Sequence, residues 1–212
     1  MYKDSKNIQV VHHPLIQSLL TKIRDISTNN YEFRQSCKIL SRFLVYEAIK
    51  DLNMRLTEVK TPVGNASGVV LTDYVILAPV LRAGLVMAEE AQILLPNAKI
   101  YHIGLKRNEE TLEAMSYYSN LPKQIPTESV VFILDPMLAT GGSALSVCKL
   151  FDDLKISNIN LVSIVSAPEG IDKIHSNFPH IKIITASIDK CLNEKGYIVP
   201  GLGDCGDRLF AT

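Results

Sequence analysis

The sequence has no excess charge of either sign. Its 22 Lys and Arg residues equal its 22 Asp and Glu residues, and no basic run stands out. There is therefore no electrostatic case for binding nucleic acid or an anionic membrane. No window approaches the roughly 18 apolar residues that a membrane-spanning helix needs. Residues 1–14 contain no apolar core long enough for a signal peptide.

Cysteine and histidine are also sparse and scattered. The four cysteines form no Cys-x-x-Cys pair, and the five histidines include no His-Glu-x-x-His motif. We therefore expect reduced thiols, a cytoplasmic location and no metal bound by protein ligands. The 212 residues, 47% hydrophobic and 21% charged, fit one globular domain of ordinary size.

Apolar periodicity predicts an α/β fold, an open and mostly parallel sheet flanked by helices. Helical spacing covers residues 15–23 and 31–52, and weak alternation predicts a hairpin or projecting β-arm over Arg55–Asp73. Strands are expected at Tyr74–Ala78, Ile100–Leu105, Val130–Leu134 and Leu161–Val165, with a helix ending near Leu95. Strands that alternate with helices form parallel sheets.

The single domain is expected to have three parts. Residues 1–73 supply helices and the arm, and residues 74–180 supply the core sheet. Residues 181–212, which include the apolar segment Ile183–Ser187, are expected to form a small hood over the ligand edge of the sheet.

The most informative segment joins the strand Val130–Leu134 to a helix through Asp135 and a loop of small residues. The first N–H groups of a helix lack internal partners and attract anions. Gly141 and Gly142 let the backbone approach a phosphate, while the Thr140 and Ser143 hydroxyls can donate to it. No Lys follows the glycines, so this is not a nucleoside-triphosphate P-loop.

The loop suits a phosphate monoester, and Asp135 could accept hydrogen bonds from sugar hydroxyls. The segment therefore predicts a sugar-phosphate site. Taken alone, the Thr-Gly-Gly-Ser string favours an ordinary capped turn, and the acid at the end of the strand and the other segments shift the interpretation to a phosphate site.

Three other segments point to the same edge of the sheet. Arg82 follows a strand and precedes a helix, which suits a second phosphate group, although it could be a surface arginine. Lys106–Glu110 and the polar residues 111–126 suggest an active-site lid or a solvated charge run. The glycine-rich loop Gly201–Gly206 could read a flat heterocycle through its main chain, or be a tight surface turn.

These segments resemble signatures of the uracil phosphoribosyltransferases. Asp-Pro-Met-Leu-Ala-Thr-Gly-Gly-Ser is similar to that family's phosphoribosyl-pyrophosphate (PRPP) motif. Further similar segments follow the family's order from about residue 75 to the C-terminus: Leu-Arg-Ala-Gly, Arg-Asn-Glu-Glu-Thr-Leu-Glu, Ala-Pro-Glu-Gly, Thr-Ala-Ser-Ile-Asp and Gly-Tyr-Ile-Val-Pro-Gly-Leu-Gly-Asp.

The resemblance implies a role for each matching residue. The PRPP site would comprise Arg82, Arg107, Asp135, Pro136, Met137, Leu138, Ala139, Thr140, Gly141, Gly142, Ser143 and Asp204. Of these, Arg82 and Arg107 would bind the pyrophosphate and act with Asp135 in catalysis. Uracil would lie against Ile198, Gly203, Asp204 and Cys205, mainly through their main chain.

The resemblance also implies cofactors and partners. Mg²⁺ would be carried by the diphosphate substrate, and the protein would form a homodimer or higher homo-oligomer through its arm. Some relatives are activated by GTP, and the sequence does not decide whether this chain is. The implied reaction converts uracil and PRPP to UMP and diphosphate, in pyrimidine salvage.

The chain departs from the family pattern at four positions. Cys205 replaces an expected Ala, Val86 a Gly, Lys106 a Tyr and Ala114 a Pro. If its side chain lies at the pocket wall, Cys205 would narrow the base pocket, and its thiol should react with alkylating reagents. The other interpretation is a buried thiol that does not contact the ligand. Two alternatives stay open: a phosphoribosyltransferase for another base, and a non-catalytic PRPP-binding regulator that binds RNA or DNA.

Overall fold

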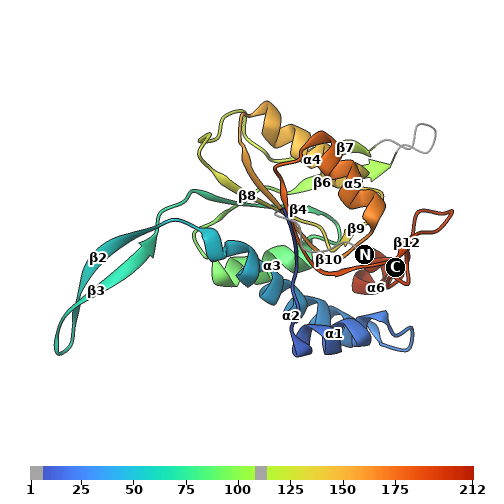
Figure 1. The fold of residues 1–212 in the computed structure, drawn as a ribbon, viewed down its shortest axis with the longest axis horizontal. Coiled ribbons are helices and arrows are strands. Elements are labelled where there is room, and N and C mark those ends of the chain that lie inside the picture. Colours follow the sequence, from blue (N-terminus) through green and yellow to red (C-terminus); the bar gives the residue numbers. More distant parts are fainter. Residues whose placement is uncertain (1–6, 108–113) are drawn as a thin grey trace.

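The computed structural model describes residues 7–107 and 114–212, and within these ranges nine strands form the main sheet (Figure 1). The strand order is β1 (Ile8–Val10), β11 (Lys182–Ile188), β10 (Asn158–Ser166), β8 (Val130–Leu134), β4 (Val75–Leu81), β6 (Ile103–Arg107) and β7 (Ala114–Ser119). Two short strands pair off this path, β5 (Lys99–Ile100) with β4 and β9 (Met137–Leu138) with β10.

The pairings are parallel except that β7 runs antiparallel to β6. The carboxyl ends of β4, β6, β8, β10 and β11 therefore meet at one edge, where open α/β sheets bind their ligands. The expected parallel sheet with helices on both faces is confirmed.

Side chains of β8 alternate between two apolar cores, one on each face of the sheet. Val130, Phe132 and Leu134 pack with α1 (Pro14–Arg24), α2 (Asn30–Ala48), α3 (Leu85–Leu94) and α6 (Cys205–Phe210). Val131 and Ile133 pack with α4 (Gly142–Asp153) and α5 (Pro168–Asn177). Figure 1 shows the two helix layers on opposite sides of the sheet.

The helices begin where the sequence supplies caps. The Asn29 side chain accepts a hydrogen bond from the Glu32 N–H at the start of α2, and the His13 ring accepts one from the Leu15 N–H at α1. A short 3₁₀ helix, Ile49–Asp51, follows α2. None of the helices in the described part of the chain is long and apolar enough to cross a membrane.

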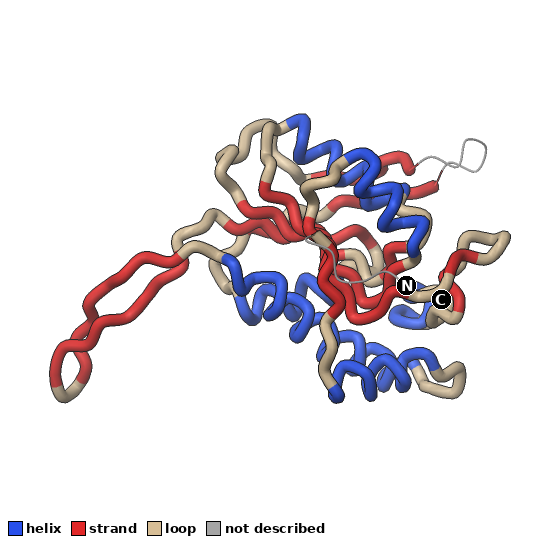
Figure 2. Tube along the Cα trace, viewed as in Figure 1, coloured by secondary structure: helices blue, strands red, loops and turns tan. Residues whose placement is uncertain are grey.

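The predicted arm is confirmed as a two-stranded hairpin that projects from the body of the protein (Figure 2). It consists of β2 (Met54–Thr61) and β3 (Gly64–Leu71), paired antiparallel from Met54–Leu71 to Thr61–Gly64. Most of its residues are exposed.

Two expectations were wrong in detail. Ile183–Ser187 was expected in the hood, but it belongs to β11 inside the main sheet, where β1 and β10 flank it. The hood is therefore smaller: it contains β12 (Cys191–Leu192), β13 (Ile198–Val199) and the glycine-rich loop that follows them. Besides its helices and the arm, the N-terminal part supplies the sheet strand β1.

The second error concerns the polar segment 111–126, expected to be a long loop. Its residues 114–119 form β7, an edge strand with exposed Tyr117 and Tyr118. A solvated edge strand lacks the apolar run that marks a buried strand, which explains the error. Most of the expected lid motif, residues 108–113, lies outside the described residues.

Candidate active site at the carboxyl edge of the sheet

Two adjoining pockets lie at the carboxyl edge of the sheet. One, of about 270 Å³, is lined by Arg82, Asp135, Asp204 and Cys205 among others. The other, of about 160 Å³, is formed by residues 135 and 137–144. Asp135, Met137 and Ser143 line both pockets, so the two can hold connected parts of one ligand.

The smaller pocket is built by a strand, a kink and a helix. After β8 the Asp135 N–H donates to Val162 O at 3.2 Å, and Pro136 O accepts from Ile164 and Val165 at 3.0 and 3.1 Å. The chain then pairs again with β10 through β9 before it enters α4. These bonds fix the loop backbone to β10 on the side away from the pocket.

The helix α4 starts without a side-chain cap. Its N-cap residue is Gly141, in the left-handed conformation with φ +74°, which has no side chain to cap the first turn. The N–H groups of that turn lack partners within the helix, and with the positive end of the helix dipole they line the smaller pocket. This arrangement suits an anion such as a phosphate monoester.

Gly170 in α5 supports this loop from behind. A Cβ on Gly170 would lie 2.4 Å from Ala139 O, and one on Gly141 would lie 2.9 Å from Gly170 O. Two backbones therefore meet with no room for a side chain. This role of Gly170 was not predicted, although a glycine inside a helix costs stability and is itself a sign of close packing.

Lys173, one turn further along α5, was also missed. Its Nζ would lie 4.0 Å from a Cβ placed on Gly142, so the ammonium group stands beside the phosphate loop. Lys173 is exposed, and a sequence reading cannot distinguish it from other solvated lysines.

Asp135 lies where the two pockets join. Burial raises the pKa of its carboxyl group to about 7, while the hydrogen bond that Oδ1 accepts from the Met137 N–H at 3.4 Å acts in the opposite direction. The carboxyl group therefore takes up or releases a proton near neutral pH, and a bound cation or sugar hydroxyl would favour its charged form.

Arg82 lies between β4 and α3, beside the C-terminal helix. Its Nη2 is 3.4 Å from Asp207 Oδ1, and the guanidinium lies 5.6 Å from the centroid of the Phe210 ring. The side chain is 54% exposed, so it remains accessible to an anion. Arg82 shares the larger pocket with Asp204 and Cys205, which follow the turn at Gly201–Gly203.

The glycine-rich loop adopts conformations that only glycine takes easily. Gly201 and Gly203 have φ of +60° and +82°. The Asp204 side chain accepts a hydrogen bond from the Asp207 N–H at 3.0 Å and so caps α6. Ile198 is buried and Gly203 exposed, and neither lines the larger pocket.

Cys205 lies in the pocket wall as a buried thiol, 2% exposed. Its contact with the Cys37 thiol, followed by burial, raises its pKa well above the usual value. Because the thiolate is the reactive form, the reason to expect alkylation at Cys205 disappears. Of Arg107, the structure describes only the backbone, which lies at the carboxyl end of β6.

Comparisons with known proteins agree with this architecture. A model of the family described as Uracil phosphoribosyltransferase matches residues 10–212. The uracil phosphoribosyltransferase of Dictyoglomus turgidum is 48% identical over 204 residues, which cover 96% of this chain and 98% of that protein. The solved structure of the AQ2163 protein from Aquifex aeolicus has a TM-score of 0.90 at 41% identity, covering 97% of this chain and 98% of that chain.

A solved adenine phosphoribosyltransferase from Leishmania donovani covers 100% of this chain and 98% of its own, with a TM-score of 0.57 at 21% identity. At 21% identity this likeness concerns the fold alone, and the family match adds the class: the chain is a phosphoribosyltransferase. The sequence identity to a uracil phosphoribosyltransferase over nearly the full length identifies the family more specifically. The chain belongs to the uracil phosphoribosyltransferase family, and it is an enzyme of that class.

The raised pKa of Asp135 predicts how stability depends on pH. The folded chain keeps a proton up to a pH of about 7 that the unfolded chain loses near its ordinary pKa of 3.8, so this group makes stability fall as pH rises between these values. We expect Asp135→Asn to raise the Tm by roughly 2–4 °C at about pH 8, if about 1 kcal/mol is recovered. Calorimetry from about pH 4 to 8 should show that the difference in Tm between Asp135→Asn and the wild type disappears at the acid end. A difference in Tm that is independent of pH would contradict the assignment.

Proposed function

We propose that this enzyme transfers the phosphoribosyl group of PRPP to N1 of uracil, giving UMP and diphosphate in pyrimidine salvage. The observation that carries the proposal is the junction of three elements at one edge. The uncapped start of α4 forms an anion pocket, Arg82 borders the adjoining pocket, and the glycine-rich hood loop reaches the same pocket through Asp204 and Cys205.

The reaction needs positioning and charge stabilisation rather than a covalent nucleophile. As the bond from C1 of the ribose to the diphosphate breaks, C1 becomes positive, uracil N1 attacks the opposite face, and the N1 proton is lost to the diphosphate or to solvent. The α4 N-terminus holds the 5-phosphate, and Arg82 with Arg107 would stabilise the charge of the departing diphosphate. Asp135, between the pockets, would hold the ribose hydroxyls and face the developing positive charge.

Uracil would be read by the main chain of Ile198, Gly203 and Cys205, with Asp204 between the base and the phosphoribosyl group. The positive φ at Gly203 orients the peptide groups of this loop in a conformation that residues with a side chain rarely adopt. The Cys205 side chain then sets the size of the pocket wall, which gives this chain a narrower pocket than Ala would.

Two carboxylates at this edge are engaged in other contacts, which favours a metal ion that arrives bound to the substrate. Asp204 caps α6 and Asp207 pairs with Arg82, so both already have partners. Within residues 7–107 and 114–212, no three His, Cys, Asp or Glu side chains group closely enough to hold a metal. Mg²⁺ favours phosphate oxygens and water, and when bound to the diphosphate it would neutralise leaving-group charge.

The direct test is to mix pure protein with labelled uracil, PRPP and Mg²⁺ and to measure UMP. We expect turnover, and we expect Asp135→Asn to lower kcat by at least about a hundredfold, the usual loss when one preorganised electrostatic partner is removed. The exposed Asp153, at the far end of α4, supplies the matched control Asp153→Asn.

The first alternative, a phosphoribosyltransferase for another base, is tested by replacing uracil with other bases. PRPP binding without turnover would support the second alternative, a non-catalytic regulator. Near-wild-type activity of Asp135→Asn would remove this residue from the mechanism. We extend the proposal to GTP as an effector on family resemblance alone, so the assay is run with and without GTP. A rate unchanged by GTP removes that extension.

The Mg²⁺ assignment makes its own prediction. After dialysis against a chelator, the substrate-free protein should retain no Mg²⁺ by elemental analysis, and activity should return when Mg²⁺ is added with PRPP. Titration of Mg²⁺ into protein alone should give no saturable heat, with Mg²⁺ into PRPP alone as the control. Stoichiometric Mg²⁺ on the substrate-free protein would show that protein ligands hold it.

We also propose a homodimer that buries the arm. Met54 and Leu56 lie directly opposite Leu71 and Val69 across the hairpin, and these four side chains are 53–81% exposed. Such an apolar face on a projecting ribbon needs a partner to be stable in water.

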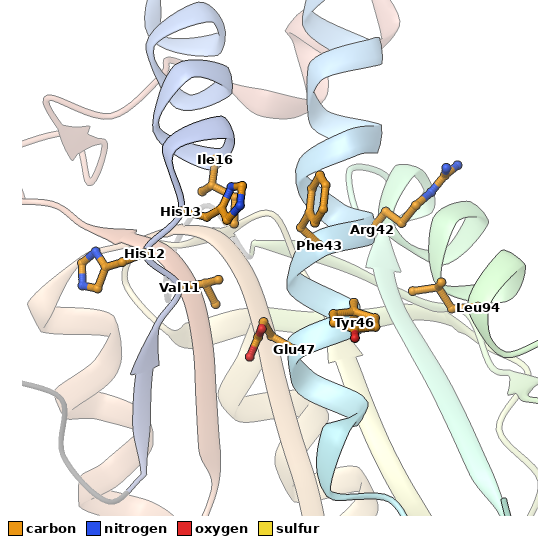
Figure 3. Close-up of a pocket in the computed structure, with 9 residues that line it drawn as sticks. All are labelled: Val11, His12, His13, Ile16, Arg42, Phe43, Tyr46, Glu47 and Leu94. Atoms are coloured by element: carbon orange, nitrogen blue, oxygen red, sulfur yellow. The ribbon is translucent and has the colours of Figure 1, made fainter. Parts of the chain in front are cut away.

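A second unpartnered surface lies on the α1, α2 and α3 side (Figure 3). It is a pocket of about 400 Å³ lined mainly by apolar and aromatic side chains: Val11, His12, His13, Ile16, Arg42, Phe43, Tyr46, Glu47 and Leu94. A two-fold axis that laid each arm on the other protomer would bury the arm and this pocket together.

Light scattering after size exclusion tests the dimer. We expect a dimer for the wild type and a monomer for Leu56→Glu, because a charge in the centre of the apolar face opposes its burial. Asn65→Glu, near the arm tip and on the polar part of the hairpin, is the control and should stay dimeric. An unchanged mass for Leu56→Glu would remove the arm from the interface.

The cytoplasm is the proposed location. Cys37, Cys148, Cys191 and Cys205 are all free thiols, as expected in a reducing compartment.

A further inference from the structure

A buried ion pair holds the backbone of Gly201 on both of its polar sides. The Gly201 N–H donates to Asp189 Oδ2 at 2.8 Å, and Gly201 O accepts from Arg24 Nη1 at 2.7 Å. Arg24 also donates from Nη1 and Nη2 to the two oxygens of Asp189, at 2.7 and 2.6 Å. The three residues form a closed ring of hydrogen bonds, which we call the Arg24–Asp189 clamp.

The clamp is fully satisfied. Ser187 Oγ donates to Asp189 Oδ1 at 2.8 Å and accepts from Arg24 Nη2 at 3.1 Å. The Asp189 side chain is only 2% exposed and that of Arg24 is 23% exposed. Burial alone would raise the pKa of Asp189, but the hydrogen bonds from Arg24, Ser187 and Gly201 outweigh it and lower the pKa. The pair therefore stays ionised around neutral pH.

Gly201 is the point at which the hood loop turns most tightly. A Cβ there would lie 2.1 Å from Ile198 O, and φ is +60°. The turn therefore sets the direction in which the main chain continues to Asp204 and Cys205, which line the larger pocket. Neither Arg24 nor Asp189 lines that pocket, so any effect on a ligand must act through the loop.

A second arginine fixes the next residue of the loop to the same place. Arg208 Nη1 donates to Leu202 O at 2.8 Å, and Nη2 donates to Asp25 O, next to Arg24 in sequence. The guanidinium lies 4.1 Å from the centroid of the Phe33 ring. The end of α1 is therefore the support to which Gly201 and Leu202 are both attached.

The phosphate loop is attached elsewhere. Its backbone bonds go to β10, and its close packing is with Gly170 in α5. Asp189 is also anchored on β10, where Ser166 O accepts from its N–H at 2.8 Å, but the side chains that hold Gly201 and Leu202 are not those that hold the phosphate loop. Changing these side chains therefore need not loosen the phosphate loop.

We propose that Arg24 and Asp189 are positioning residues for uracil: the clamp fixes Gly201 so that the main chain of the hood loop keeps the geometry that reads the base. The inference rests on the proposed function of that loop. Under this proposal the C-terminal end of α1 helps to determine the affinity for the base, although this end of the helix does not contact the substrate.

Steady-state kinetics with both substrates tests the clamp. Asp189→Asn and Arg24→Lys keep the approximate shape of each side chain and lose part of the ring. We expect each to raise the KM for uracil by about tenfold, the equivalent of one lost hydrogen bond, while the KM for PRPP changes by less than about twofold. Calorimetric binding of PRPP should also be unchanged.

The matched control is Lys22→Ala in the same last turn of α1. It removes a surface ion pair with Glu32 at 2.9 Å and does not contact the hood. Ser187→Ala is a milder variant that deletes only the accessory hydroxyl, and it serves if the other two fail to fold. It should raise the KM for uracil alone, by a smaller factor.

The outcomes separate the two proposals. A wild-type protein that forms no UMP overturns the proposed function and this inference with it. An active wild type whose variants lose Tm but keep both KM values shows a purely structural ion pair and overturns the inference alone. Equal rises in both KM values do the same, because the clamp would then act on the whole site.

Discussion

The parallel pairing of β4, β6, β8, β10 and β11 is the constraint on which the candidate site depends. Parallel pairing brings the carboxyl ends of these five strands to one edge of the sheet. Arg82, Asp135 and the hood therefore lie close together although they are far apart in sequence. The two apolar cores hold the sheet from both faces, and residues at their margins, such as Cys205 and Leu138, also line the pockets. The scaffold therefore fixes the walls of the site directly.

Backbone proximity sets the finer geometry. Gly84, Gly141, Gly170 and Gly201 each stand where a Cβ would come within 3 Å of another main-chain atom. Both ligand loops therefore rely on places where two backbones touch, and their peptide groups can face a substrate. Because such contacts tolerate no added methyl group, the loops are rigid in the direction that matters for binding.

The sequence predicted the parts of the site that are encoded locally. The segment from Val130 to Ser143 contains its own strand, turn and helix start, so its anion pocket could be inferred, and so could the place of Arg82. The clamp could not be inferred, because Arg24 and Asp189 are 165 positions apart and meet only after β11 has entered the sheet. Because Ile183–Ser187 was assigned to the hood, Asp189 was not recognised as the residue that follows a strand of the sheet. A residue in that place lies at the ligand edge. Gly170 was named within a family motif, but its contact with Ala139 depends on how α5 packs.

Arg82 shows how the site can stay ordered before substrate arrives. Its guanidinium is held by Asp207 and lies over Phe210, both in the C-terminal helix whose cap, Asp204, borders the pocket. An exposed ion pair of this kind is worth about 0–1 kcal/mol, so a diphosphate with several charges can take over the arginine at little cost. The exchange would release Asp207 next to Gly206 and the start of α6. Because Asp207 and Cys205 belong to the same short helix, this ion pair links Arg82 to the wall of the pocket in which the base is expected.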